Sequence, residues 1–258
     1  MRIAVLVKEV PDTWGERRLD PETGLVDRTG SPAVLDEIGE RAVEAALAYA
    51  DAHAGTEVVV VTMAPASATA NVRKALAMGA TSALHVVDDR LRGADLVLTA
   101  DVLAAAVRRV APDLVIAGNV STDGGGGGLP AMLAETLGMP HLTALASLDI
   151  RADGVAGDRL SDAGTLRVSA PLPAVVSITE ALPAGRFANF KGIMAAKKKP
   201  YETVTCDALG IEPDDPAVAR YIMLSVAERP PRAAGTKIVD EGDAGRRLAE
   251  FLIRENLA

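Results

Sequence analysis

The chain has very few of the residues that build disulfide frameworks, cysteine metal sites and aromatic clusters. Its 258 residues include one cysteine, Cys206, with three Phe, three Tyr and one Trp. A single cysteine excludes both an intramolecular disulfide and a metal centre made of several cysteines. Since 49% of the residues are nevertheless hydrophobic, the core must consist of Ala, Val, Leu and Ile. This bias is typical of parallel strands that helices cover on both faces.

Long apolar runs and a surplus of positive charge are also missing. No apolar run reaches the length of about 18 residues that a membrane-spanning helix needs, and the first residues lead straight into a predicted strand. We therefore expect a soluble, cytoplasmic protein with no leader peptide and no direct membrane insertion. The formal net charge of −8 argues against a nucleic-acid-binding surface over the whole molecule.

Short apolar segments alternate with amphipathic ones along the first 180 residues. Strands are predicted at 3–7, 58–63, 84–87, 114–117 and 174–178, and helices at 34–49, 67–78, 100–110 and 131–137. This alternation predicts an α/β fold with three layers, in which a doubly wound, mostly parallel sheet is Rossmann-like and of the adenine-nucleotide-binding type. Residues 150–170 carry turn signals and predict an antiparallel excursion, a β-hairpin.

The pattern changes after residue 180, and three parts are expected. Residues 1–180 form the α/β nucleotide-binding domain, residues 181–200 an exposed arm without core periodicity, and residues 201–258 a C-terminal extension. The extension reads as an extended tail that ends in an amphipathic helix near 245–256. The basic run at 197–199 is interpreted as a solvated charge run or a partner contact.

Five consecutive glycines, Gly124 to Gly128, lie between a predicted strand and a predicted helix that opens with Leu129 and Pro130. Glycine lets backbone N–H groups approach a ligand closely, and proline suits a first helical turn. A strand, a glycine loop and a helix N-terminus together predict an anion site of the phosphate type. The loop matches neither G-x-x-x-x-G-K-[ST] nor G-x-G-x-x-G. A flexible surface linker is the alternative.

No catalytic constellation is present in the sequence. His53, His85 and His141 are scattered without metal-ligand spacing, no serine lies in a nucleophile elbow, and no base lies near Cys206 in the chain. The residues alone support a nucleotide-binding α/β module with an exposed arm, without catalytic or metal-binding residues of its own.

Several segments, in their order along the chain, resemble the β subunit of the electron transfer flavoproteins. They are residues 5–13, 36–44, 73–80, 117–124, 172–177 and, most specifically, the arm sequence Arg-Phe-Ala-Asn-Phe-Lys-Gly-Ile-Met-Ala-Ala-Lys-Lys-Lys at 186–199. The resemblance covers essentially the whole chain.

The resemblance implies a heterodimer in which an α subunit holds most of one FAD. The β subunit would bind AMP in a crevice of its sheet, help to enclose the flavin and wrap its C-terminal extension around the α subunit. Such a chain is an electron carrier subunit rather than an enzyme, because the redox chemistry belongs to the cofactor. Electrons would pass from primary dehydrogenases, such as the acyl-CoA dehydrogenases of fatty acid oxidation, to a quinone oxidoreductase.

The resemblance also implies site residues. AMP contacts are expected at Leu6, Asp36, Glu37, Ile38, Gly39, Met63, Asn119, Val120, Ser121, Thr122, Asp123, Gly124, Gly125, Gly126, Gly127, Gly128, Leu129 and Pro130. The phosphate is expected over 126–129, with Ser121 and Asp123 capping the loop or meeting the ribose. Thr13 is expected near the flavin.

The arm is expected to recognise the partner dehydrogenase. Phe190 would dock into the partner, followed by Ile193 and Met194 at the start of a short helix, whereas Phe187 is expected to pack beneath the arm as its anchor.

Two alternatives remain open. In the first, the chain belongs to an electron-bifurcating member of the family, with a second FAD in place of AMP. In the second, it is a stand-alone adenine-nucleotide-binding protein of the universal stress type, which would have no use for the arm at 187–199.

Overall fold

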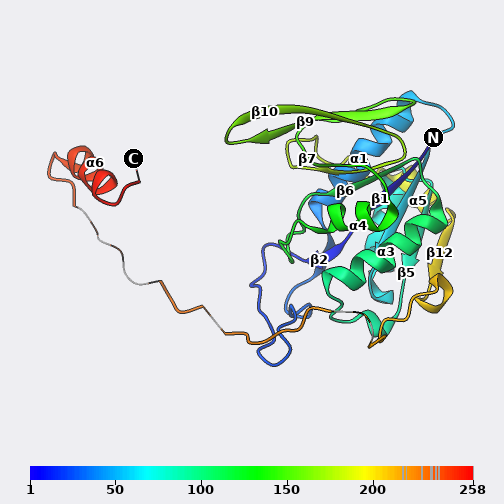
Figure 1. The fold of residues 1–258 in the computed structure, drawn as a ribbon, viewed down its shortest axis with the longest axis horizontal. Helices are drawn as coiled ribbons and strands as arrows, with labels where there is room; N and C mark the ends of the chain where they lie inside the picture. Colours follow the sequence, from blue (N-terminus) through cyan, green and yellow to red (C-terminus); the bar gives the residue numbers. More distant parts are fainter. Residues whose placement is uncertain are drawn as a thin grey trace. The chain divides into compact units, whose positions relative to one another are not determined.

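The computed structural model describes residues 1–216, 218, 220–227, 229–232, 235, 237 and 239–257. It divides the chain into two units, Met1–Leu224 and Ser225–Ala258, which we describe separately. Figure 1 shows the first unit as a layered α/β structure, in which helices cover both faces of a twisted sheet.

The main sheet is mostly parallel, as the sequence predicts. Its strands follow the spatial order β10 (Gly164–Pro171), β9 (Gly154–Ser161), β7 (His141–Leu145), β11 (Ala174–Ile178), β6 (Leu114–Gly118), β1 (Arg2–Leu6), β4 (Glu57–Met63), β5 (Ser82–Val86) and β12 (Tyr201–Val204). All neighbouring pairs from β7 to β12 are parallel. Strands β9 and β10 form the predicted antiparallel hairpin, and the short β8 (Asp149–Ile150) pairs with β9. Figure 1 shows this hairpin at the margin of the sheet.

Two apolar cores, one on each face of the sheet, produce the three predicted layers. Side chains of β1 alternate between them, so Ile3 and Val5 enter one core while Ala4 and Leu6 enter the other. The first core is covered by α1 (Glu37–Ala52) and α2 (Thr69–Met78), and the second by α3 (Leu96–Val110) and α4 (Leu129–Leu137). Three single 3₁₀ turns connect these elements: η1 (Ala66–Ala68), η2 (Asp89–Leu91) and η3 (Asp207–Leu209).

Two parts of the first unit have no counterpart in the sequence pattern. Strands β2 (Glu9–Pro11) and β3 (Ala33–Leu35) form a separate two-stranded sheet that closes the base of the long polar loop at residues 12–32. Residues 201–204, which the sequence pattern assigns to the extension, pair with β5 as strand β12. Only Val204 of β12 is buried, so this strand has no apolar periodicity to reveal it.

The second unit contains α6 (Ala244–Arg254), close to the predicted C-terminal helix. None of its residues is buried in the part of the chain described, and Leu248 and Ile253 are exposed. Among the described residues, no helix has the length and apolar character to cross a membrane.

Candidate functional site

The chain reverses its winding direction between β1 and β6. These strands are neighbours in the sheet, but the chain leaves β1 through α1 toward β4 and leaves β6 through α4 toward β7 on the opposite side. Ligands of doubly wound sheets bind at such a switch point, beyond the carboxyl ends of the strands. The glycine loop, residues 119–128, leaves β6 at this point (Figure 1).

The backbone of the glycine loop requires glycine and leaves N–H donors free. Gly125 and Gly127 adopt positive φ angles of 63° and 65°, which favour glycine strongly over other residues. Helix α4 follows directly, with Gly128 as its N-cap and proline in its first turn. Within the described chain, the N–H groups of Gly126, Gly127, Gly128 and Leu129 donate no hydrogen bond. These donors and the positive end of the helix dipole make an anion-binding surface.

A buried carboxylate organises the start of this loop. The side chain of Asp123 is only 2% exposed, with Lys8 Nζ 2.6 Å from its Oδ1 and Arg28 Nη2 2.7 Å from its Oδ2. Its Oδ1 also accepts the N–H of Gly124 at 2.6 Å. Burial by itself would raise the pKa of Asp123, but the bonds from Lys8, Arg28 and Ser121 outweigh it and lower that pKa to about 2. The cluster therefore carries net positive charge beside the free N–H groups.

A second buried carboxylate joins helix α1 to the glycine loop. Asp36 is 1% exposed, and its Oδ2 accepts the N–H of Thr122 at 2.9 Å. Its Oδ1 and the Thr122 Oγ1 are buried without a hydrogen-bond partner in the described chain. Burial raises the pKa of Asp36. Buried polar atoms are normally hydrogen-bonded, so Asp36 Oδ1 and Thr122 Oγ1 are suited to bind a polar group of a ligand.

The structure gathers most of the expected nucleotide contacts at the ends of β1 and β6. Leu6 ends β1, and Gly39 lies against Val7, so that a Cβ there would be 3.5 Å from the Val7 backbone. Ile38 packs on Gly118, where a Cβ would come within 2.6 Å. Met63 lies one strand further, at the end of β4.

Two expected site residues lie apart from this group. Glu37 is turned outward, with its carboxylate 2.7 Å from Arg41 and a 70% exposed side chain. Thr13 lies in the loop at residues 12–32, beside the 95% exposed Trp14. These positions therefore belong to the surface around the switch point rather than to its interior.

The sequence analysis missed three cations at the site. Lys8 follows β1 directly, so its place at a strand's carboxyl end was a usable signal. Arg17 and Arg28 lie in the polar loop at residues 12–32, where nothing in their spacing indicates a partner. Arg17 donates to the backbone carbonyl of Thr122, and Arg28 binds Asp123.

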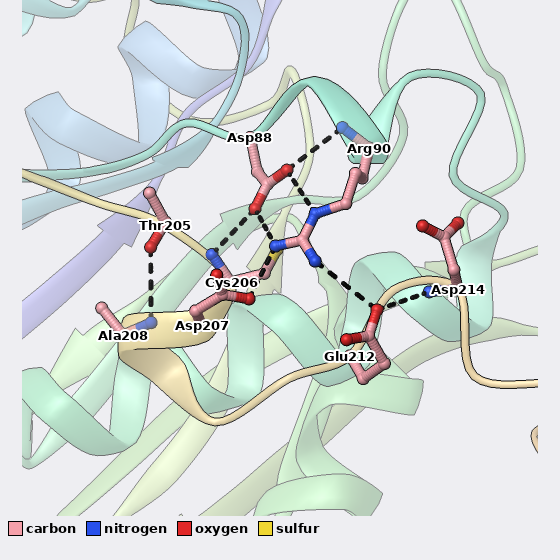
Figure 2. Close-up of polar contacts among 8 residues, drawn as sticks. All are labelled: Asp88, Arg90, Thr205, Cys206, Asp207, Ala208, Glu212 and Asp214. Atoms are coloured by element: carbon pink, nitrogen blue, oxygen red, sulfur yellow. Dashed lines mark hydrogen bonds and ion pairs between the residues drawn. The ribbon is translucent and has the colours of Figure 1, made fainter.

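A different polar cluster lies at the carboxyl ends of β5 and β12, at the margin of the sheet (Figure 2). The Arg90 guanidinium binds Asp88 through two nitrogens at 2.7 and 3.0 Å, Asp207 at 2.7 Å and Glu212 at 3.5 Å. It holds the pKa of Asp88 well below its usual range. Asp88 also accepts the N–H of Cys206 at 3.2 Å. The cluster fixes the chain that follows β12.

Cys206 does not have the environment of a reactive thiol. It is fully buried, and burial first, then the nearby Asp88, raises the pKa of its thiol to about 11. A thiol with such a pKa is protonated at neutral pH and is a poor nucleophile.

The arm is anchored on its underside and exposes apolar side chains on its outer side. Its short helix α5 (Phe190–Ala196) packs on α2, where a Cβ on Gly192 would lie 2.3 Å from a backbone oxygen. Upstream of α5, Arg186 binds Glu44 with two bonds of 2.7 and 2.8 Å. Phe190 is 79% exposed, and the expected partner contacts Ile193 and Met194 are each 47% exposed.

One expectation about the arm is wrong, and another, the solvated charge run at 197–199, holds for Lys197 and Lys198 but not for Lys199. Phe187 is 99% exposed and does not anchor the arm; Arg186 supplies that contact, because its guanidinium reaches a carboxylate on α1. Lys199 is not a solvated charge either, since its ammonium donates to the carbonyls of Leu76 and Ala80 at 2.8 and 2.6 Å. Leu76 lies in the last turn of α2 and Ala80 just beyond its C-cap, where the helix dipole favours a cation.

Fold and site together define a class: a doubly wound α/β protein with a glycine loop at its switch point and an arm that exposes apolar side chains. Residues 23–209 match the family model described as electron transfer flavoprotein domain. The chain belongs to the electron transfer flavoprotein family and is similar over nearly its whole length to the β subunits of that family.

The relatives cover almost the entire chain. The electron transfer flavoprotein subunit beta of Mycobacterium tuberculosis is 44% identical over 262 residues, covering 99% of this chain and 98% of its own. The protein of the same name from Syntrophomonas wolfei is 32% identical, with 98% and 96% covered. The caffeyl-CoA reductase-Etf complex subunit CarD of Acetobacterium woodii is 35% identical, with 83% and 82% covered.

Proposed function

We propose that the chain is the β subunit of a heterodimeric electron transfer flavoprotein that binds one AMP at the glycine loop. It helps to enclose a FAD held mainly by the α subunit. The observation that carries the nucleotide site is the set of free N–H groups at 126–129, at the switch point and beside a net positive cluster. Such a site suits one phosphate group.

The buried polar atoms suit the rest of a nucleotide. The orphaned Asp36 Oδ1 accepts an N–H of the ligand, and the Thr122 hydroxyl is free to donate or accept a bond. AMP stays in place through the reaction and supplies no redox chemistry. FAD supplies that chemistry when the heterodimer is assembled, with Thr13 approaching it from this subunit.

The proposed electron flow runs from primary dehydrogenases, such as those for acyl-CoA, to a quinone oxidoreductase, in the cytoplasm. The arm supports the first step, because exposed aromatic and aliphatic side chains on a rigid base suit a partner pocket. The exposed apolar side chains of α6 suit the role of the C-terminal extension, which we propose to wrap the α subunit.

Ligand stoichiometry tests the proposal. The chain is co-expressed with its α subunit, the ligands are released by heating, and FAD and AMP are counted per heterodimer. We expect one of each. Two FAD without AMP would contradict the AMP site and favour the bifurcating alternative. A chain that forms no heterodimer and carries only an adenine nucleotide would favour the stress-protein alternative.

Changing Phe190 to Ala tests the arm. We expect electron transfer from the dehydrogenase to slow on the order of tenfold or more, since a central aromatic at an interface contributes about 2 kcal/mol. FAD content, AMP content and Tm should stay unchanged, because the ring is 79% exposed. Rates are measured by stopped-flow reduction of the flavin.

Leu160→Ala is the matched control, since Leu160 is an apolar side chain 62% exposed on the β9–β10 hairpin. Unaffected kinetics in Phe190→Ala would contradict docking. So would a stability loss like that of a core Phe deletion, about 3–5 kcal/mol.

A further inference from the structure

We propose that Lys8 and Arg28 are positioning residues, which act through Asp123 to hold the glycine loop in its phosphate-binding shape. The inference rests on the proposed nucleotide site and goes beyond it, because neither cation has to contact the ligand. It also gives a role to the loop at residues 12–32, which carries Arg28.

The two cations reach Asp123 from independent parts of the fold. Lys8 follows β1 at the centre of the sheet, 115 positions before Asp123, whereas Arg28 lies 95 positions before it in a surface loop. Each cation takes a different oxygen of the same carboxylate. Asp123 is therefore held from both sides while its neighbours in the glycine run stay exposed.

Lys8 fixes the turn that opens the loop. Its ammonium lies 3.3 Å from Ser121 Oγ as well as 2.6 Å from Asp123 Oδ1. Both acceptors in turn receive the N–H of Gly124, at 3.3 and 2.6 Å. The first glycine is thus tied to a rigid strand end through these side chains. Conformational freedom of the next glycines, which is costly to freeze, is reduced before the ligand arrives.

Arg28 connects this turn to the loop at residues 12–32. That loop is closed at its base by β2 and β3 and by the bond from Asp12 N–H to the Pro32 carbonyl at 2.9 Å. Further along, Leu19 and Val26 form an isolated bridge. The loop is therefore an organised element, and Arg28, with Arg17 on the Thr122 carbonyl, fastens it to residues 122 and 123.

Electrostatics makes both partners necessary. A carboxylate that is 98% buried stays ionised only while cations and hydrogen bonds compensate its lost hydration. Removing one cation leaves a buried, half-compensated charge, which is relieved when Asp123 turns toward water. Such a turn would move the attached glycine run and misplace its N–H groups.

The test uses the αβ complex with AMP bound. Release of AMP is followed by exchange against labelled AMP, and Tm is measured on the same samples. We expect Arg28→Ala to release AMP on the order of tenfold faster, because a glycine loop that is no longer pre-organised holds the phosphate less well. Arg28→Lys, which keeps the charge, should recover part of the retention. Lys8→Met should accelerate release likewise, with partial recovery in Lys8→Arg.

Arg18→Ala is the matched control, because Arg18 lies in the same loop and pairs with Glu16. It should release AMP at the wild-type rate. Wild-type release from Arg28→Ala and Lys8→Met, or a lowered Tm with unchanged release, would overturn the positioning role and leave the nucleotide site standing. A wild-type complex without AMP would overturn the site and the positioning role together.

Discussion

Two polar clusters, one around Asp123 and one around Arg90, lie at the carboxyl ends of the parallel strands and carry opposite net charge. In the first, one buried acid is held by two cations, Lys8 and Arg28. In the second, one arginine is held by three acids, Asp88, Asp207 and Glu212. The first is net positive and adjoins free N–H groups at the switch point. The second is net negative and adjoins the margin of the sheet (Figure 2).

The difference shows what separates the proposed anion-binding site from a structural anchor built from the same types of bond. At Arg90 the flanking backbone groups are used internally, as when the N–H of Cys206 bonds to Asp88. At Asp123 the internal hydrogen bonds end with Gly125, whose N–H donates to the Ser121 carbonyl at 3.0 Å, and within the described chain the N–H groups of 126–129 donate none. N–H groups without a partner, next to positive charge, suit an anion. N–H groups that are already hydrogen-bonded within the chain only hold the backbone in place.

Matched glycine substitutions should give the largest difference between the Asp123 region and the Arg90 region. Gly127 and Gly210 have similar positive φ angles, 65° and 72°, but Gly127 lies in the glycine loop and Gly210 follows η3 in the Arg90 region. Valine at either position should cost about 1–2 kcal/mol from backbone strain. Only Gly127→Val should also lose AMP and weaken heterodimer assembly, because its side chain enters the approach to the N–H groups.

Nucleotide content per heterodimer and Tm, measured on both variants, check this prediction. Equal AMP content in the two variants would show that the glycine loop is not the site. Loss of AMP from both would show that strain anywhere at this edge of the sheet is transmitted to the nucleotide.

Removing the Arg90 guanidinium should have a smaller and different effect. Arg90→Ala leaves Asp88 without its main partner and frees the chain after β12. We expect faster cleavage within 205–216 by a protease that cuts before aspartate, since this segment carries Asp207, Asp214 and Asp215, with AMP content unchanged. Limited proteolysis followed by mass spectrometry locates the cuts. Loss of AMP with no new cuts would mean that the two clusters are coupled rather than independent.

The smallest expected effect concerns Asp36 and has a defined pH dependence. Burial raises the pKa of Asp36 above its ordinary value of 3.8, so the folded state disfavours the ionised form and stability from this group falls as pH rises through the raised pKa. Asp36→Asn should therefore raise the Tm of the AMP-depleted complex at pH 7 by about 2–4 °C, corresponding to about 1 kcal/mol.

The gain from Asp36→Asn should shrink as pH falls below 4, where the wild-type carboxyl is protonated in folded and unfolded chains alike. Scanning Tm from pH 7 down to about pH 3 on both proteins measures this loss of the gain. A gain that is the same at every pH would mean that the charge of Asp36 is not what opposes folding.

Much of the fold was predictable because its signals are local. β-branched runs, amphipathic periods and the β9–β10 turn residues specify each element within a few positions, and their alternation indicates a doubly wound sheet. Glycine conformations are also local, so the composition of the loop at Gly125 and Gly127 by itself predicts positive φ angles there. Strand β12 was not visible, since its pattern becomes apolar only at Val204.

The sequence by itself determined most strands of the sheet, the helices that cover it, the hairpin, the glycine loop and the arm. Only the tertiary structure decided that Lys8 and Arg28 meet Asp123, that Phe187 points into solvent and that Lys199 caps α2. The physical reason is that helices and strands are specified by the pattern of residues that are close together in the chain. The partner of a charge or a ring is instead set by which distant segments the folded sheet brings within a few ångströms, and no spacing along the chain encodes that distance.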